Sequence, residues 1–431
     1  MNRKLFLVIF ALLLSSAVNA ELRIEITQGT SDPVRIAIVP IDWNIPFPAS
    51  IYLHEVVTSD LEFIGEYSVL RPEKMLSFPF SEKEIFYRDW RLLDVDFLVF
   101  GRAILLEAKD KNNIEVSYWV YDIARQKKIH KAFITGSLNS LRSLAHGMSD
   151  SIYREISGLK GIFSTRILYV DGSNFINERY ELRSCDFDGM RDRLLFSSDA
   201  PIISPSWSPN GELITYVSFE LGTSNIYTQE IKTGKRKLIK PQKGLNSAPT
   251  WSMNSKYLAA VLSNKGNSDI YRYDIKNRTW KRLTRHYAID TEPDWSSDSK
   301  KIIFTSNRSG SPQIYELKFS NGRVKRLTFK GNYNARARYL PDGKNIIYVH
   351  RDNGVFHLAK KNIRTGEMVI LTDTNLDESP TVAPNGNLVM YATKYQDENV
   401  LAGISIDGRT SFVLPSASGE VRDPAWSPFL N

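Results

Sequence analysis

The chain has 431 residues, of which 42% are hydrophobic and 24% are charged. This composition is that of an ordinary globular protein with two or three domains, and it excludes a disordered, collagen-like or disulfide-stapled chain. Lys and Arg outnumber Asp and Glu by eight, and Cys185 is the one cysteine. A single cysteine excludes an intrachain disulfide and a cysteine-based metal site.

The first twenty residues have the pattern of a secretory signal peptide. Arg3 and Lys4 precede an apolar run at residues 5–14, and small residues follow up to Ala20. Ten apolar residues are too few for a helix that crosses a hydrocarbon core of ~30 Å. The alternative is a buried N-terminal helix, but the order of basic, apolar and small residues favours export and cleavage after Ala20.

Residues 21–161 predict a compact α/β or α+β domain, within an α+β protein of two domains. Alternating apolar residues, a continuous β-branched run and helical periodicity distinguish its elements. In chain order we expect a strand at 22–27, a buried strand at 34–41 and a helix at 50–64. A second helix is expected from the capping box Ser81-x-x-Glu84 to about Leu92. A strand at 95–106, a hairpin of 114–123 with 128–136, and a helix at 140–156 that Gly158 ends should follow. Residues 158–164 are then a short linker.

From residue 205 onward, a phrase of the form Pro-x-Trp recurs every 43 or 44 residues. Its copies begin at Pro205, Pro249, Pro293, Ala337, Pro380 and Pro424. After each of the first five copies come a turn and three further strand-like runs, which is the signature of a propeller blade. The sixth copy has no blade after it, and the run at 166–170 has no copy before it. We therefore expect residues 424–428 to pair with 166–170 and close a ring, which leaves no open sheet edge there.

The predicted fold is thus a small N-terminal α/β domain followed by a six-bladed β-propeller over residues 162–431, with ring closure by the C-terminal strand. The repeated tryptophans are interpreted as packing between blades rather than as stacking sites for sugars or bases. The repeated Asn-Gly and Asp-Gly pairs are interpreted as turns rather than as metal ligands.

The sequence contains no recognisable catalytic or metal-binding motif. There is no Gly-x-Ser-x-Gly, P-loop, Gly-x-Gly-x-x-Gly or His-Glu-x-x-His sequence, and the histidines show no ligand spacing. His350 and His357 are expected on different strands of one blade. We predict no catalytic residue, no metal site and no cofactor.

The positive charge belongs to the propeller part of the chain. Residues 162–431 contain 37 basic and 28 acidic side chains, whereas residues 21–161 contain 17 and 20. A cluster of cations at 232–243 is either a solvated rim or a contact for an anionic partner. For an exported chain, anionic envelope surfaces and acidic proteins are better candidates than nucleic acid.

The signal peptide, the mature start at Glu21-Leu-Arg-Ile-Glu-Ile26, the small α/β domain and the six Pro-x-Trp blades together resemble the TolB family of the Tol-Pal system. The match extends to Thr291-Glu-Pro-Asp-Trp295 and to the closing Asp423-Pro-Ala-Trp-Ser-Pro428. The chain departs from the family pattern at 253–255 and 337–339. The resemblance implies a non-enzymatic periplasmic adaptor that joins TolA to the peptidoglycan-associated lipoprotein Pal, keeps the outer membrane intact and draws it inward during division.

The resemblance also implies two partner-binding sites. An extended segment at 21–32 would bind TolA, through Glu21, Leu22, Arg23, Ile24, Glu25, Ile26 and Thr27. One mouth of the propeller, formed by the loops that lead into the inner strands, would bind Pal through Ser204, Asn246, Ser247, Ala248, Asp290, Thr291, Glu292, Asn307, Arg308, Asn334, Arg336, Asp377, Glu378, Arg422 and Asp423. A short alternating strand at a chain end is suited to adding onto a partner's sheet, although a permanently docked edge strand has the same pattern. The alternative function is a propeller enzyme, a lyase or glycosidase acting on envelope polymers.

Overall fold

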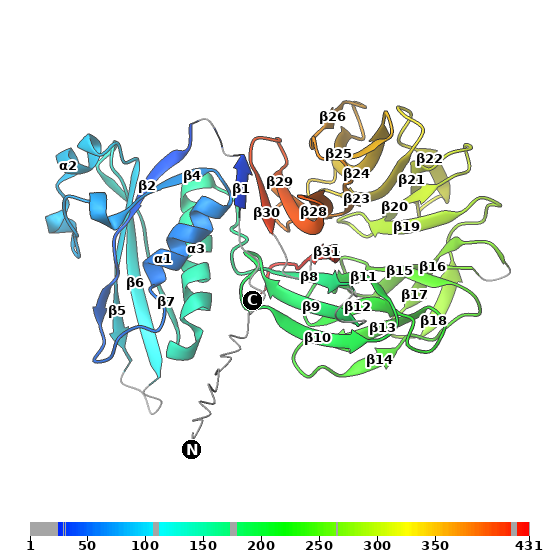
Figure 1. Cartoon of the computed structure of the whole chain (residues 1–431), viewed down its shortest axis with the longest axis horizontal. Coiled ribbons are helices and arrows are strands. Elements are labelled where there is room, and N and C mark those ends of the chain that lie inside the picture. The colour runs from blue at the N-terminus through cyan, green and yellow to red at the C-terminus, as the bar shows by residue number, and fades with distance from the viewer. Residues whose placement is uncertain are drawn as a thin grey trace, which may run out of the picture.

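The computed structural model describes residues 25–28, 30, 32–106, 112–172, 179–263, 266–414 and 420–430. It contains an N-terminal α/β domain and a six-bladed β-propeller, which lie side by side (Figure 1). The predicted fold class is therefore confirmed. The signal peptide and its cleavage site lie outside the described residues. Within the described part of the chain, no helix has the length and apolar character needed to cross a membrane.

The N-terminal domain is built on one mixed sheet with strand order β4-β2-β5-β6-β7, to which β3 is added beside β5. Its strands are β2 (Val34–Ile38), β3 (Asp42–Asn44), β4 (Tyr67–Leu70), β5 (Phe97–Leu105), β6 (Asn113–Asp122) and β7 (Lys127–Ser137). Its helices are α1 (Leu53–Phe63), α2 (Tyr87–Leu92) and α3 (Leu141–Ser157), with single 3-10 turns η1 (Pro72–Lys74), η2 (Glu82–Glu84) and η3 (Leu138–Ser140).

Alternation along the strands sends apolar side chains to both faces of this sheet. One face packs with α1 and α3 in a cluster that contains Ile36, Val99 and Met148. The other packs with the segment from η1 to α2 in a cluster that contains Ala37, Phe100 and Trp90. Successive strand residues such as Ile36 and Ala37 point to opposite sides of the sheet, and both sides are buried because other elements cover each of them.

The capping box predicted a single helix from Ser81 to Leu92, and this prediction is wrong. The Ser81 hydroxyl donates to Glu84 Oε1 at 2.9 Å instead of capping a backbone N–H, and Glu84 Oε2 accepts the N–H of Phe80 at 2.8 Å. The chain makes one 3-10 turn there, and α2 begins at Tyr87. By contrast, α3 ends as expected, because Gly158 adopts a left-handed φ of 77°.

Each propeller blade is a four-stranded antiparallel sheet, numbered here from its innermost strand outward. Blade 1 contains β31 (Val421–Trp426), β8 (Arg166–Asp171), β9 (Tyr180–Asp186) and β10 (Arg193–Ser198). Blade 2 contains β11 (Ile202–Trp207), β12 (Leu213–Ser218), β13 (Asn225–Glu230) and β14 (Arg236–Leu238). Blade 3 contains β15 (Asn246–Trp251), β16 (Tyr257–Leu262), β17 (Asp269–Asp274) and β18 (Thr279–Arg282).

The second half of the ring repeats this order. Blade 4 contains β19 (Asp290–Trp295), β20 (Lys301–Ser306), β21 (Gln313–Lys318) and β22 (Arg323–Arg326). Blade 5 contains β23 (Asn334–Tyr339), β24 (Asn345–Asp352), β25 (Val355–Asn362) and β26 (Met368–Ile370). Blade 6 contains β27 (Glu378–Val382), β28 (Leu388–Tyr395), β29 (Glu398–Ser405) and β30 (Ser411–Leu414), and β1 (Glu25–Gln28) joins it as a fifth strand.

The ring closes as the sequence predicted. Strand β31 pairs antiparallel with β8, with Arg422 opposite Val170 and Trp426 opposite Ile167. The tryptophans of the repeat are buried between blades, which confirms the packing interpretation: the indole N–H of Trp207 donates to Ala425 O on the neighbouring blade at 3.1 Å. The turn interpretation also holds, because Gly211 has a φ of 72° and Asn210 Oδ1 accepts the N–H of Glu212.

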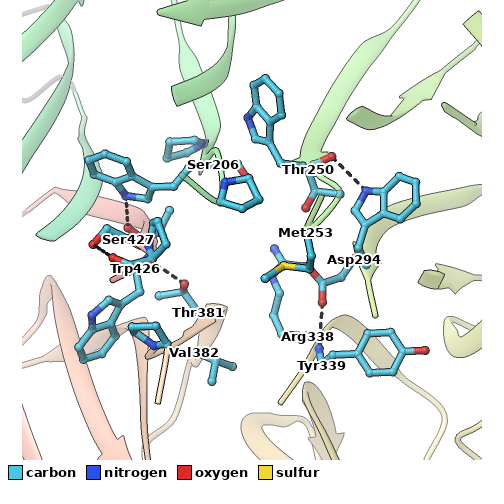
Figure 2. Close-up of a pocket in the computed structure, with 18 of the residues that line it drawn as sticks. Ser206, Thr250, Met253, Asp294, Arg338, Tyr339, Thr381, Val382, Trp426 and Ser427 are labelled. Atoms are coloured by element: carbon cyan, nitrogen blue, oxygen red, sulfur yellow. Dashed lines mark hydrogen bonds between the residues drawn. The ribbon is translucent and has the colours of Figure 1, made fainter. Parts of the chain in front are cut away.

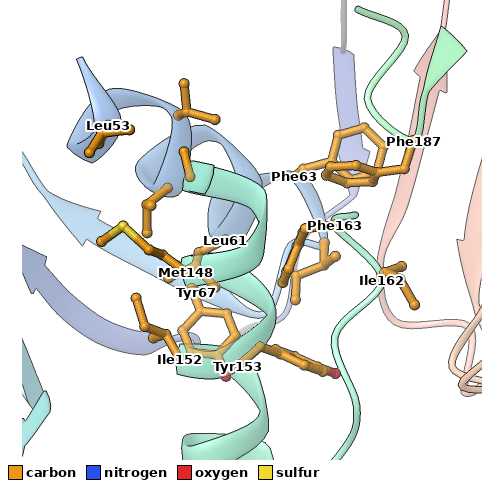
Figure 3. Packing of buried hydrophobic residues seen from close by; sticks show 14 of the residues in the cluster. Leu53, Leu61, Phe63, Tyr67, Met148, Ile152, Tyr153, Ile162, Phe163 and Phe187 are labelled. Atoms are coloured by element: carbon orange, nitrogen blue, oxygen red, sulfur yellow. The ribbon is translucent and has the colours of Figure 1, made fainter. Parts of the chain in front are cut away.

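One apolar cluster continues from the N-terminal domain into the propeller (Figure 3). Phe63 at the end of α1 contacts Phe187 of blade 1, with ring centroids 4.8 Å apart, and Phe412 of β30, at 4.2 Å. Gly403 on β29 allows this contact, because an added Cβ would lie 2.0 Å from the Phe412 ring. The docked strand β1 therefore pairs with a strand that also forms the interface between the domains.

Candidate partner-binding surfaces

The innermost strand of every blade carries a bulge at the same place. Six non-glycine residues there have positive φ angles between 46° and 53°, namely Ser204, Ala248, Glu292, Arg336, Ser379 and Asp423. The strand register shifts at each of these points. A left-handed non-glycine residue costs about 1–2 kcal/mol, and such strain concentrates at functional sites. We refer to these six residues as the bulge ring.

The bulge ring surrounds one end of a central cavity of about 520 Å³. Two residues further along the inner strands, hydroxyl and charged side chains line this cavity, among them Ser206, Thr250, Asp294 and Arg338 (Figure 2). Burial raises the pKa of Asp294, although Arg338 opposes this effect. The backbone N–H of Tyr339 donates to Asp294 at 2.9 Å, which ties blade 5 to blade 4.

Arg336 connects four blades across the bulge ring. Its Nε donates to Glu292 Oε1 of blade 4 at 2.9 Å, and its backbone N–H donates to Glu292 Oε2 at 3.0 Å. Its Nη1 contacts Ser379 of blade 6 and lies 3.5 Å from Asp423 of blade 1. The carboxylates of Glu292 and Asp423 raise the pKa of Arg336, whereas its burial acts in the opposite direction. Arg336 thus fixes the shape of the mouth.

The predicted Pal-facing residues fall into two groups. Asn246, Asp290, Asn334 and Asp377 are buried at the start of an inner strand or just before it, and they form hydrogen bonds to their own blade or to the preceding one. Asp290, for example, accepts two hydrogen bonds of 2.8 Å from Arg308, which brings Asn307 and Arg308 to the same mouth. The remaining residues of the set are half-buried or exposed: Ser204, Ser247, Ala248, Thr291, Glu292, Asn307, Arg308, Arg336, Glu378, Arg422 and Asp423.

Sequence reasoning placed most of these residues in loops, and this placement is wrong. Asn246, Ser247 and Ala248 belong to β15, and the corresponding residues of blades 4 and 5 belong to β19 and β23. Sequence reasoning started each inner strand at the Pro-x-Trp phrase. In fact the bulge sits directly before the Pro, so the strand continues through both.

Strand β1 is docked on the propeller. It runs antiparallel to β30, with Glu25 opposite Val413 and Ile26 opposite Phe412. The part of the predicted TolA-binding segment at residues 21–24 lies outside the described residues. Three paired positions are a small contact, because a net backbone hydrogen bond contributes about 1 kcal/mol.

Sequence reasoning missed a buried ionic cluster between the two domains. His146 of α3 is 1% exposed, and its Nδ1 lies 2.8 Å from Asp60 Oδ2 of α1 while its Nε2 lies 3.5 Å from Asp186 Oδ2 of blade 1. Asp60, His146 and Asp188 offer ligand atoms within 4.8 Å of one another. Arg142, however, pairs with Asp188 and neutralises it. The arrangement is therefore an ion-pair network that joins the domains.

The charge state of this cluster follows from its neighbours. Burial alone would lower the pKa of His146, but the carboxylates of Asp60 and Asp186 outweigh burial and raise it to about 9. Burial opposes ionisation of Asp186 too, yet His146 and Arg191 hold its pKa below the ordinary value. No spacing rule could have found the cluster, because Asp60 and His146 are 86 residues apart. His350 and His357 face each other on β24 and β25, as expected.

Comparison with known proteins gives concordant matches over both domains. The family model of the TolB amino-terminal domain matches residues 22–129, and that of the TolB beta propeller domain matches residues 153–430. The Tol-Pal system protein TolB of Pseudomonas fluorescens strain Pf-5 is 50% identical over 99% of this chain and 98% of its own length, and that of Alcanivorax borkumensis is 48% identical over 100% and 99%. Their name describes a Tol-Pal system protein rather than an enzyme.

A solved structure agrees with these relatives. The crystal structure of TolB from Acinetobacter baumannii is 39% identical and superposes with a TM-score of 0.87, covering 95% of this chain and 100% of that one. Sequence and fold thus match over essentially the whole length, in both domains and in their order. The chain belongs to the TolB family of the Tol-Pal system.

Proposed function

We propose that this protein is a non-enzymatic periplasmic adaptor that binds Pal at the bulge-ring mouth and TolA through residues 21–32. It maintains outer-membrane integrity and takes part in the invagination of the outer membrane during division. Residues 1–20 direct export and are removed after Ala20, residues 21–161 form the N-terminal domain, and residues 162–431 form the propeller. The pairing of β1 with β30 carries the proposal, because a strand that adds to its own sheet edge can add to a partner's.

The docked strand makes the adaptor switchable. Three paired positions hold β1 on β30, so its release costs a few kcal/mol, which is comparable to typical coupling energies of about 1–3 kcal/mol between sites. Pal at the mouth biases the choice between the docked strand and a strand offered to TolA. The bulge-ring mouth supports the Pal assignment, because strained backbone and half-buried polar side chains of six blades gather there.

Two variants separate the two sites. Deletion of residues 21–32 from the mature chain is expected to abolish TolA binding and to leave Pal binding intact, with a change in Pal affinity no larger than the coupling of about 1–3 kcal/mol. Thr291→Lys, which places a long cation at the half-buried mouth, is expected to weaken Pal binding at least about tenfold, because an unpaired buried charge costs several kcal/mol. Thr233→Lys, on an exposed turn of blade 2, is the matched control.

Binding is measured by calorimetry with purified Pal and TolA, and circular dichroism confirms that each variant is folded. Loss of both partners in the deletion variant would reject the two-site arrangement. Equal Pal affinity of Thr291→Lys and Thr233→Lys would reject the mouth as the Pal site.

A further inference from the structure

The outer hairpins of three adjacent blades carry a positive surplus of fourteen charges, which is larger than the surplus of eight for the whole chain. Each of these hairpins spans fourteen residues, counted from the last residue of the third strand of its blade. In blades 2, 3 and 4 these hairpins are residues 230–243, 274–287 and 318–331, and together they contain sixteen basic and two acidic residues. In blades 5, 6 and 1 the corresponding hairpins are 362–375, 405–418 and 186–199, and they contain four basic and seven acidic residues. We call the outer surface of blades 2–4 the basic wall.

Most cations of the basic wall are exposed to solvent. Thirteen of its sixteen cations are exposed, and within the described residues none of the thirteen forms an ion pair. Two of the half-buried cations form ion pairs, because Arg236 pairs with Glu220 and Arg282 pairs with Asp269. Both acidic residues of the wall are engaged locally, because Glu230 accepts from Thr233 and Asp274 accepts from Asn277.

The repeat aligns these charges in space. Lys237, Lys281 and Lys325 are 44 residues apart and lie opposite Thr228, Arg272 and Glu316 of the preceding strands. They therefore occupy the same register on β14, β18 and β22. Glu316 is already bonded to Lys301 and to the Tyr339 hydroxyl. In Figure 1, β18 and β22 lie on the side of the propeller away from the N-terminal domain, and β14 lies at the lower edge of the propeller.

Protection of sheet edges does not explain the pattern. Lysines on edge strands do prevent edge-to-edge association. However, the outer strand β26 of blade 5 has the uncharged sequence Met368-Val369-Ile370, with Val369 45% and Ile370 41% exposed. The edge of blade 6 is covered by β1. Edge protection by charge would be needed on β26 as well, yet the charge is confined to blades 2–4.

From this asymmetry we propose that the basic wall binds an anionic phospholipid surface. Ten of the thirteen exposed cations are lysines. Lysine is depleted from protein–protein interfaces, and arginine is the residue that recognises individual carboxylates and phosphates by paired hydrogen bonds. A broad array of lysines suits a diffuse layer of lipid phosphates, to which each lysine contributes about 1 kcal/mol. The wall uses the outermost strands, so a membrane bound there leaves the bulge ring and β1 accessible.

The test measures partition of the mature chain onto vesicles of phosphatidylcholine with about 30% phosphatidylglycerol, and onto pure phosphatidylcholine vesicles. We expect binding to the anionic vesicles alone, and a steep loss of binding between about 0.05 M and 0.3 M salt. The triple variant Lys237→Gln, Lys281→Gln, Lys325→Gln is expected to bind about a hundredfold more weakly, from about 1 kcal/mol for each lysine.

The matched control removes three exposed lysines from the N-terminal domain, by Lys74→Gln, Lys83→Gln and Lys127→Gln. It has the same net charge as the first triple variant and is expected to bind almost as the parent does. Equal losses in the two variants, or no binding to anionic vesicles, would overturn the proposal. Equally tight binding of poly-glutamate, lost in the first variant, would replace lipid by an acidic protein as the partner. Pal and TolA are absent from this assay, so its result is independent of the adaptor proposal.

Discussion

The buried His146 is expected to make the junction between the domains weaken as the pH rises. Its pKa of about 9 exceeds the ordinary value of 6.5, so the folded state binds the proton more tightly than the unfolded chain does. The difference between these two pKa values corresponds to about 3 kcal/mol of stabilisation of the folded state. This contribution is fully present below pH 6.5 and is lost as the pH rises through about 9.

The perturbation is His146→Asn, which removes the charge and leaves Asp60 and Asp186 buried without it. At pH 6.5 we expect the free energy of unfolding to fall by about 3–5 kcal/mol, the usual cost of breaking a buried ion pair from one side. Between pH 6.5 and 9.5 the parent should lose about 3 kcal/mol more than the variant does. Asp60→Asn together with His146→Asn should recover part of the loss, because fewer buried charges remain uncompensated.

Urea unfolding followed by circular dichroism, repeated across this pH range, measures both quantities. His54→Asn is the control: burial lowers the pKa of His54, so its removal should not reduce the loss of stability between pH 6.5 and 9.5. The reasoning would be refuted if His146→Asn had the same pH dependence as the parent. A loss below about 1 kcal/mol at pH 6.5 would show that the cluster is solvated rather than buried.

Three further perturbations test the ring and the interface by thermal unfolding. Deletion of residues 420–431 removes β31 and exposes the edge of β8. We expect the propeller to unfold cooperatively, with a free energy of unfolding lower by more than about 5 kcal/mol, because burial of Trp426 alone accounts for about 3–5 kcal/mol. Arg336→Ala removes the bonds to Glu292 and Asp423 and should cost about 1–2 kcal/mol, and Arg336→Lys should recover little of it because Lys lacks the planar fork. Gly403→Ala places a Cβ against the Phe412 ring and should cost about 1–3 kcal/mol by displacing it.

Each of these has a contrary outcome. A deletion variant that melts at the parent temperature would show that β31 does not close the ring. Full recovery by Arg336→Lys would show that charge alone, rather than the hydrogen bonds, holds the mouth. An unchanged melting temperature for Gly403→Ala would show that Phe412 has room to move.

The repeat in the sequence determined the propeller, its six blades and its closure. A repeat period of about 44 residues allows few other folds, because it provides the four strands of one blade. The phrase at 424–428 has no blade after it, so it pairs with the strand at 166–170, which has no phrase before it. Local chemistry also determined the end of α3 at Gly158, where a left-handed residue stops the helix. The capping box at Ser81 wrongly predicted the start of a helix, because the Ser81 and Glu84 side chains bond to each other. Which bonds these side chains form depends on how the segment packs on β5 and β6.

Only the tertiary structure decided which of the mouth residues face outward and what joins the domains. Asp290 and Thr291 are neighbours in the chain, yet Asp290 is buried against Arg308 while Thr291 is half-buried at the mouth. Asp60, His146 and Asp186 come from three distant segments, and each by itself has the pattern of an ordinary surface residue. Periodicity reports which face of an element is buried, because burial repeats along the chain. Contacts between segments that are far apart in sequence leave no local signal, so the ionic junction and the shape of the mouth appear only when the chain is folded.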